Sequence, residues 1–356
     1  MPISAIDAIS PAFQHTRQQL FQPFRAGQWA RLALVGLLAG ELTTGSCNGF
    51  NTNVHAPRQP QQFFLPTAPN MDPGLLALLI AVLLVLGFVF WILLLYVNSV
   101  MRFILFDSVI ARNCRIRQNW NRRQGPGLRY FLWQILFGLA IFMGFTILIG
   151  VPAAVAFAAG WLSKPKEHLA PLILFGIVLF LVLMTYIVIA AVVHVFTKDF
   201  VIPQMAIEDI SAFQAWARLL PILDSEKGPY FGYVVMKIVM ALGVGLVVGI
   251  ITTVVILVTL IPIGGLGALF VFAGKAAGFS WNLYTITLAV VVACVLLAVI
   301  LYVVSVVSVP AMVFFPAYSI YFFASRYPAL DALIHPSAPL PPTVPITAQP
   351  EPMPSM

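Results

Sequence analysis

Apolar stretches of about 20 residues or more, long enough to cross a bilayer, recur along this chain of 356 residues. The clearest cover residues 74–97, 128–151, 169–196, 230–261 and 286–309. Hydrophobic residues make up 61% of the chain and charged residues only 9%, whereas soluble domains carry about 25% charged residues. A chain of this composition cannot bury all of its apolar side chains away from water, so we expect lipid to surround it. Because a long apolar segment satisfies its own backbone only as a helix, the sequence predicts an all-α, polytopic membrane protein.

A sixth apolar run, residues 29–44, is shorter and carries Glu41 near its end. It reaches spanning length only if its helix begins one turn earlier. With this run included, the sequence predicts six transmembrane helices in three hairpin repeats, each preceded by an interfacial amphipathic helix. All six belong to a single membrane domain, residues 1–328.

The repeat shows in three similar stretches spaced by about 100 residues. The tripeptide Ala-Phe-Gln at residues 12–14 recurs at residues 212–214, and each copy leads through an arginine and a leucine to a glycine, an aromatic residue and a long apolar run. The middle copy, residues 112–131, is more basic and matches less well. The predicted units are residues 5–106, 107–203 and 204–326.

Each unit is predicted to begin with a helix lying along the membrane surface. In the third unit, apolar residues recur every three or four positions from Ile207 to Leu223, which is typical of an amphipathic helix. Ser211 and Gln214 form a predicted capping box. The middle helix is predicted to start at Asp107 as N-cap, and glycine-proline pairs at residues 125–126 and 228–229 are predicted to break the chain before the spans.

The predicted outer connections are of two kinds. Residues 150–160 and 264–274 are apolar and rich in glycine, and we expect them to dip into the outer leaflet or to cover the top of the bundle. Residues 45–73 are polar and contain prolines. They are either a contact site for an external partner or a flexible loop. The proline-rich segment 329–356 is predicted to be a disordered cytoplasmic tail.

The distribution of basic residues predicts the orientation of the chain in the membrane. Of the 19 Lys and Arg, 15 fall on one side of the six-span topology, so the positive-inside rule places both termini in the cytoplasm of a bacterial-type inner membrane. Basic residues beside a membrane attract anionic headgroups, whereas a nucleic-acid role would need a folded basic module that the sequence lacks. The residues predicted to meet lipid headgroups at the inner interface are Arg112, Arg115, Arg117, Trp120, Arg122, Arg123, Trp216 and Arg218.

Few ionisable residues are candidates for a position deep in the membrane. They are Glu41, His194 and Lys237, and the first two are the candidates for an intramembrane functional role, although ordinary interfacial positions would also explain them. The three cysteines are scattered and suggest neither a disulfide framework nor a zinc site. No catalytic motif is present, so the sequence predicts no enzyme activity, no metal and no cofactor.

The order of basic interfacial helix, glycine and hairpin resembles the polytopic membrane domain of bacterial glycerophosphodiester phosphodiesterases and related uncharacterised membrane proteins. Residues 103–131 and 200–231 carry the resemblance. It implies a fold and a bacterial membrane, but no catalytic residue, because the soluble phosphodiesterase domain is absent.

The function expected is that of a non-enzymatic accessory, scaffold or assembly subunit that binds lipid and a larger membrane complex. Its contacts would be made by apolar helix faces or by the loop 45–73. The alternative is a small transporter or lipid-handling permease, with the apolar segments 150–160 and 264–274 as gates.

Overall fold

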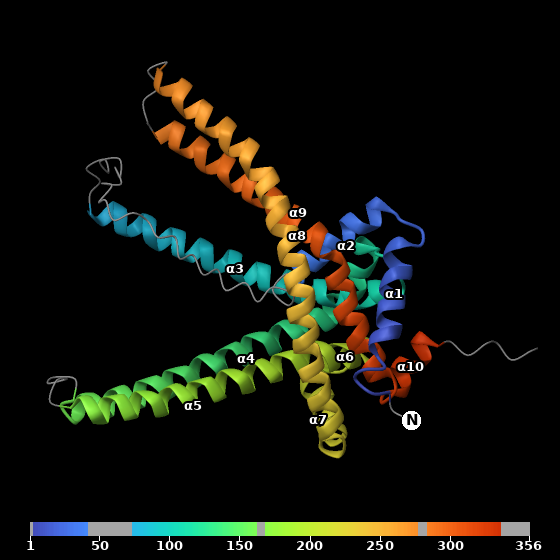
Figure 1. Cartoon of the computed structure of the whole chain (residues 1–356). Helices are drawn as coiled ribbons and strands as arrows, with labels where there is room; N and C mark the ends of the chain where they lie inside the picture. The colour runs from blue at the N-terminus through green and yellow to red at the C-terminus, as the bar shows by residue number, and fades with distance from the viewer. Residues whose placement is uncertain (1–2, 42–72, 162–167, 277–282, 336–356) are drawn as a thin grey trace, which may run out of the picture.

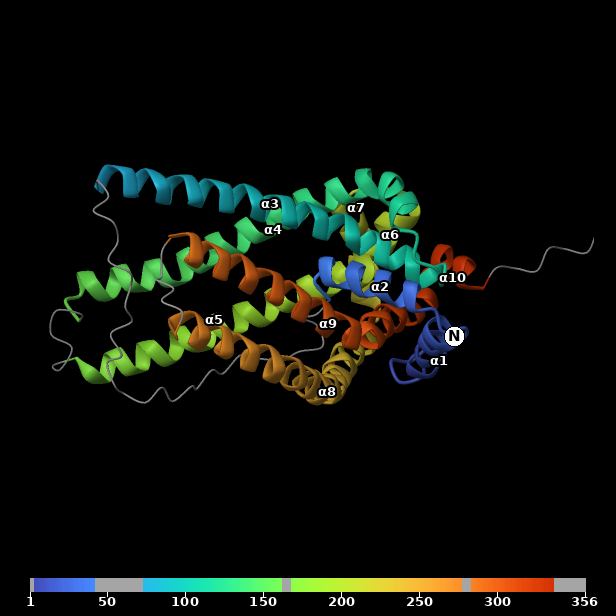
Figure 2. The same ribbon diagram turned by 90° about the horizontal axis from the view of Figure 1, so that it is seen from above.

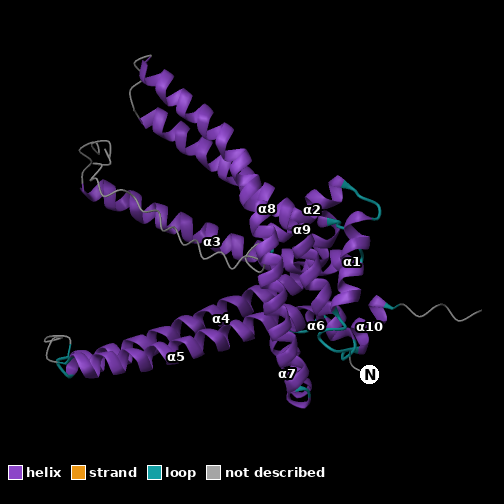
Figure 3. Ribbon diagram, viewed as in Figure 1, coloured by secondary structure: helices purple, strands orange, loops and turns teal. Residues whose placement is uncertain are grey.

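The computed structural model describes residues 3–41, 73–161, 168–276 and 283–335, where all regular structure is helical, as Figure 3 shows. The all-α prediction is thus confirmed for the described residues. Long apolar helices form arms that extend from a compact end (Figure 1). The arms are α3 (Pro73–Ile110), α4 (Ile116–Ala158) with α5 (Leu169–Phe196), and α8 (Lys227–Ala276) with α9 (Leu283–Ala324).

Five helical stretches are long and apolar enough to cross a membrane, as expected from the five clearest apolar runs. They are Ile80–Ile110, Ile116–Ala158, Leu169–Glu208, Lys227–Ile261 and Thr287–Ala324. Figure 1 shows the arms diverging, and Figure 2 shows that they project from the same side of the compact end. In the most apolar window of each span, 0% of residues are buried in four helices and 6% in the fifth. These windows therefore contain almost no residue that is buried within the protein.

The sixth predicted span, residues 29–44, is described only as far as Glu41 and does not form a crossing there. It corresponds to α2 (Ala26–Leu38), whose 13 residues rise about 20 Å, less than the thickness of the hydrocarbon core of about 30 Å. This helix packs on α9 and α3, and Gly36 allows the close approach, because a Cβ there would lie 2.2 Å from Met312 Sδ.

The short helices gather at the compact end around the inner ends of α3 and α9. They are α1 (Ile9–Phe21), α2, α6 (Ile202–Glu208), α7 (Ala212–Ser225) and α10 (Pro328–Ile334). The buried core lies here, and much of it is aromatic: Phe200, Tyr233 and Phe322 are fully enclosed, with the Tyr233 and Phe322 rings 4.6 Å apart. The compact end is therefore the part of the described chain that folds against itself.

Both ends of the described chain meet in this region. The Ile3 N–H donates to Ser325 Oγ at 3.2 Å, and Arg326 Nη1 donates to the Ile3 carbonyl at 3.2 Å. Glu41, which follows α2, lies at the compact end, where it contacts Lys198. The next described element, α3, begins at the far tip of its arm (Figure 1).

Several predicted boundaries are wrong, because the helices run further than turn residues suggest. Residues 150–158 belong to α4, and residues 264–274 lie within α8 rather than in dipping connections. The glycine-proline pair 125–126 lies inside α4, which continues through it. The first residues of the predicted tail, 329–334, are helical instead: they belong to α10, which packs against α9 and whose Leu330 is fully buried. The rest of the predicted tail, residues 336–356, and most of the predicted loop 45–73 lie outside the described residues.

Candidate functional site: a buried charge junction

The site lies where α5 ends and its chain turns into the compact end. A π-helical segment, η2 (Thr197–Val201), follows α5 directly and leads into α6. Pro203 stands in the first turn of α6. A proline lacks an N–H and clashes with the preceding turn of an α-helix, and the wider π turn relieves this conflict. The segment presents two adjacent charges, Lys198 and Asp199, to different neighbours.

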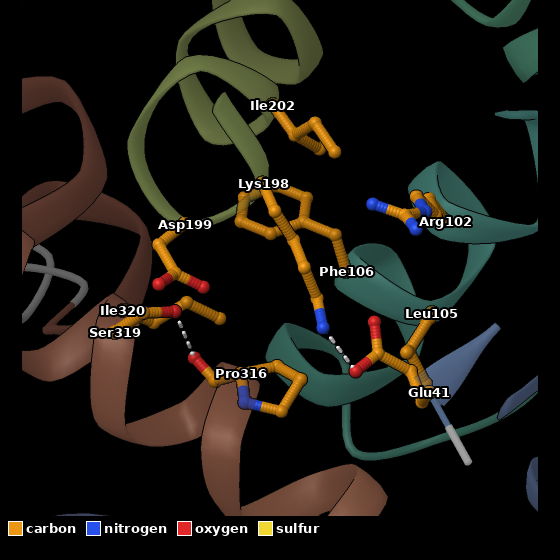
Figure 4. A pocket seen from close by; sticks show the side chains of 10 residues that line it. All are labelled: Glu41, Arg102, Leu105, Phe106, Lys198, Asp199, Ile202, Pro316, Ser319 and Ile320. Carbon is orange, nitrogen blue, oxygen red and sulfur yellow. Dashed lines mark hydrogen bonds and ion pairs between the residues drawn. The ribbon is translucent and has the colours of Figure 1, made fainter. Parts of the chain in front are cut away.

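Lys198 pairs with Glu41, which follows α2. The Lys198 ammonium donates to Glu41 Oε2, and both side chains are almost buried, at 10% and 3% exposed. Figure 4 shows the two side chains pointing toward each other across the cavity. No cation lies near Glu41 in the sequence, but the fold supplies one from 157 residues further along the chain.

Asp199 makes the second buried pair, with Lys237 of α8. The Tyr233 hydroxyl, one turn earlier on α8, donates to the same Asp199 oxygen at 2.9 Å. A carboxylate that accepts hydrogen bonds from an ammonium and a hydroxyl is held by strong, charge-assisted bonds. Thus η2 ties the end of α2, through Lys198, to the start of the α8 arm, through Asp199.

The end of α2 is also tied to α3. Arg102 Nε donates to the Ala39 carbonyl at 3.2 Å, and Asn98 Nδ2 donates to the Leu38 carbonyl at 2.9 Å. These carbonyls belong to the last turn of a helix, where the backbone has no internal donor and the helix dipole favours a cation. Arg102 Nη1 further donates to the Tyr130 hydroxyl of α4 at 3.1 Å. We name the set Glu41, Arg102, Lys198, Asp199, Tyr233 and Lys237 the charge junction.

Glu41, Arg102, Lys198 and Asp199 of the junction line a cavity of about 30 Å³, which is room for a water molecule or two. Its walls are Glu41, Arg102, Leu105, Phe106, Lys198, Asp199, Ile202, Pro316, Ser319 and Ile320 (Figure 4). His194 lies one turn before Lys198 with an exposed side chain and is not among the lining residues. Over the described ranges, no group of three or more His, Cys, Asp or Glu could hold a metal ion. The chemistry that this arrangement supports is therefore the pairing of buried charges.

Comparison with known proteins places the chain in a family. Residues 3–333 match the model of DUF7544, a family of unknown function. The chain belongs to DUF7544. No curated protein and no solved structure matches it. The DUF7544 match includes every residue of the charge junction, whereas the resemblance to the membrane domain of glycerophosphodiester phosphodiesterases stays a prediction.

The predicted inner-interface residues of this DUF7544 protein fall into two groups. Those with exposed side chains, available to headgroups, are Arg112, Arg115, Arg117, Arg122 and Arg218, although Arg218 also pairs with Glu208. The two tryptophans are partly buried. Trp120 packs edge-on against Tyr96, and the Trp216 Nε1 is buried with no hydrogen-bond partner among the described residues.

Arg123 departs from the prediction, because its guanidinium points into the protein. It forms two bonds with the Asp107 carboxylate, at 2.6 Å and 2.7 Å, and a third with the Ala206 carbonyl at 2.7 Å. Asp107 is consequently not the N-cap that the sequence suggested, since it lies inside α3 and accepts this bidentate pair. Arg123 joins α3, α4 and α6 and is closed to a lipid headgroup.

Sequence reasoning missed Lys198, Asp199 and Arg102 as parts of a site. Adjacent opposite charges at the end of an apolar run are typical of the end of a span, and nothing local shows that they turn inward. The capping box of α7 was predictable from four residues, and the structure confirms both of its bonds: Ser211 Oγ accepts from the Gln214 N–H, and the Gln214 side chain accepts from the Ser211 N–H.

Proposed function

We propose that this protein is a non-enzymatic scaffold or assembly subunit of a membrane, which binds lipid at its compact end and other membrane proteins along its arms. The observation that carries the proposal is the exposure of the arms, whose apolar windows are at most 6% buried. Membrane helices associate by close packing of their surfaces. Arms that do not use these surfaces on each other leave them open to the helices of a partner.

The features of the charge junction favour a structural role, in which it fixes the arms to the compact end, over a catalytic or transport role. Its cavity of about 30 Å³ cannot admit a substrate larger than water. Its carboxylates are each paired with an ammonium, so neither is poised as a free base. In this proposal the junction sets where the arms leave the compact end, and the arms provide the contact surface.

The orientation proposed is that of a bacterial-type cytoplasmic membrane with the compact end and both termini inside the cell. The compact end carries Arg17 of α1, Arg25 just before α2 and Arg31 of α2, together with the basic start of α4, and the positive-inside rule assigns these residues to the cytoplasm. We also retain the hairpin repeat as a proposal. It is supported by the side-by-side arms α4 with α5 and α8 with α9, and by the short helices α1 and α7 that precede α2 and α8.

Site-specific photocrosslinking from the arms tests the scaffold function. A photoreactive amino acid would replace Leu84 on α3, Phe142 on α4 or Ile250 on α8, which are all at least 60% exposed. We expect protein adducts of one defined mass from at least two arms in native membranes. The matched control places the same group at Phe322, which is fully buried and should yield only internal crosslinks. Adducts with lipid alone from every arm would refute the proposal.

The alternative, a small transporter or lipid-handling permease, draws on the charge junction, since ionisable groups in membrane segments often mark transport paths. Purified protein in vesicles would be assayed for proton leak and for lipid scrambling. If Glu41→Gln abolished a flux that the wild-type protein supports, while a surface variant such as Lys227→Met kept it, the alternative would replace the scaffold proposal.

A further inference from the structure

A second cavity, of about 370 Å³, opens at the compact end between α1, α2 and the turn that joins α3 to α4. We call it the glutamine–arginine cleft. Its lining residues are Gln18, Gln19, Gln22, Pro23, Arg25, Gln28 and Arg112. The lining is polar and includes two cations and no carboxylate, in contrast to the charge junction.

The two arginines of the cleft have no ion pair. Over the described residues, buried or half-buried guanidiniums such as those of Arg123 and Arg326 bind carboxylates, whereas neither Arg25 nor Arg112 does. Arg112 is held in place by its backbone, since its carbonyl accepts from Gln28 Nε2 at 2.8 Å. Two uncompensated guanidiniums lining one cleft are matched by an anion with several oxygens, and guanidinium suits phosphate because of its planar fork of donors.

The cleft also offers acceptors. Gln19 Nε2 donates to the Ser108 carbonyl at 2.9 Å, which leaves the Gln19 amide oxygen as an acceptor. That oxygen is buried and has no hydrogen-bond partner in the described part of the chain. A buried acceptor without a donor is costly, and a ligand hydroxyl or ammonium would satisfy it. The complementary ligand therefore combines a phosphate with a hydrogen-bond donor.

Exposed aromatic rings beside the cleft indicate where such a ligand comes from. Phe21 and Phe24, which flank the lining residues Gln22 and Pro23, are more than half exposed. Both rings contact Trp29, with centroids 5.5 Å and 5.4 Å away. Aromatic side chains of interfacial helices dip into the boundary of the bilayer and bring neighbouring arginines to the level of the headgroups.

We propose that the glutamine–arginine cleft binds one membrane phospholipid headgroup, with its phosphate at Arg25 and Arg112 and its hydroxyl or ammonium donating to the glutamine oxygens. Phosphatidylglycerol and phosphatidylethanolamine carry such a donor, whereas the trimethylammonium of phosphatidylcholine does not. This inference deepens the lipid binding of the proposed function and rests on the same placement of the compact end at the membrane, but it does not depend on partner proteins at the arms.

The test is native mass spectrometry of the full chain in detergent, titrated with short-chain phosphatidylglycerol, phosphatidylcholine or sodium phosphate. We expect one phosphatidylglycerol to bind, with phosphatidylcholine weaker by about tenfold, which is the effect of one lost hydrogen bond at a desolvated site. The double variant Arg25→Gln/Arg112→Gln should lose at least about tenfold in affinity for phosphatidylglycerol. The matched control is Arg17→Gln/Arg31→Gln, which removes the same charge from exposed arginines outside the cleft and should bind as the wild type does.

Three results would overturn the proposal. Equal losses in the two double variants would show that general charge, not the cleft, attracts lipid. Binding of sodium phosphate as tight as that of phosphatidylglycerol would point to a free anion, and equal affinity for the two lipids would remove the role of the glutamine oxygens. If the double variant fails to fold, Arg112→Lys keeps the charge but not the fork, and it should weaken phosphatidylglycerol binding more than Arg17→Lys does. These outcomes are independent of the crosslinking result. Failure of the headgroup-binding proposal can therefore be distinguished from failure of the scaffold proposal.

Discussion

The carboxylate of Glu41 and the ammonium of Lys198 form a buried ion pair between residues 157 positions apart. Glu41 follows α2, and Lys198 lies in η2, between α5 and α6. The adjacent Asp199 repeats the contact toward α8 through Lys237. Two neighbouring residues of one π-helical segment thereby connect three parts of the chain, and this makes the pair the most informative position for mutation.

Lys198→Met should destabilise the protein by about 3–5 kcal/mol, because removal of one partner leaves the other charge buried without it. The double variant Glu41→Gln/Lys198→Met should recover part of this loss, since both charges are then gone. Lys227→Met is the control, because Lys227 and Asp224 form a pair with side chains 74% and 77% exposed, and exposed pairs contribute little. Unfolding in mixed micelles with increasing denaturing detergent measures these differences. A single variant as stable as the control would contradict a structural role for the pair.

Arg123→Lys should cost about 2 kcal/mol although the charge is kept. An ammonium cannot reproduce the two parallel bonds to Asp107 and the third bond to the Ala206 carbonyl. Arg122→Lys provides the matched change at the adjacent, exposed position and should stay within about 0.5 kcal/mol of the wild type. The same unfolding measurement applies, and equal effects at the two positions would argue against the buried cross-link.

Gly127→Ala should destabilise the contact between α4 and α3 by about 1–3 kcal/mol. A Cβ at Gly127 would lie 2.7 Å from Val100 Cγ2 and 3.2 Å from Val100 Cα, and the backbone atom cannot move aside cheaply. Gly138→Ala on the same helix is the control, since a Cβ there meets nothing within 4 Å. That substitution should be neutral or stabilising by up to about 1 kcal/mol, because alanine favours a helix interior. If both substitutions are tolerated, α3 and α4 do not approach as closely as described.

Stability should fall as the pH drops below about 6.5, the ordinary pKa of histidine, through protonation of His15. Burial lowers the pKa of His15, and the nearby Arg112 acts in the same direction, while the hydrogen bond to the Val109 carbonyl opposes them. The Nε2–H donates to the Val109 carbonyl at 2.8 Å, and the Tyr321 hydroxyl lies 3.2 Å from Nδ1, which suits the neutral ring.

Because the folded pKa is depressed, the stabilisation is present above the unfolded pKa and is lost as the pH falls toward the folded one. Melting temperatures of the wild type and His15→Gln, measured from pH 7.5 to pH 5, should converge as the medium becomes more acidic. His335→Gln at the exposed end of α10 serves as the control and should keep the wild-type slope. A wild-type advantage that stays constant over this interval would contradict the prediction.

The fold class and the main helices could be predicted from local patterns. The run 169–196 coincides with α5, and the capping box at Ser211 appears as predicted, because apolar length and cap chemistry act within one segment. Helix ends were less predictable. Gly125 and Pro126 suggested a break, but α4 is continuous through them, and the next residue, Gly127, lies close against Val100 of α3. Tertiary contacts of this kind outweigh the local preference of a glycine or proline.

By itself the sequence indicated a multi-span membrane protein, since long apolar runs with few charges favour lipid over water, and it determined where the five helices that are long and apolar enough to cross a membrane would form. Only the tertiary structure decided which charged side chains are buried in the protein and which are exposed. Arg122 and Arg123 are adjacent and chemically identical, yet one is exposed and the other binds Asp107 and Ala206. The physical reason is that an ion pair depends on distance in space, and the chain path that brings Glu41 to Lys198 is set by the packing of the whole compact end.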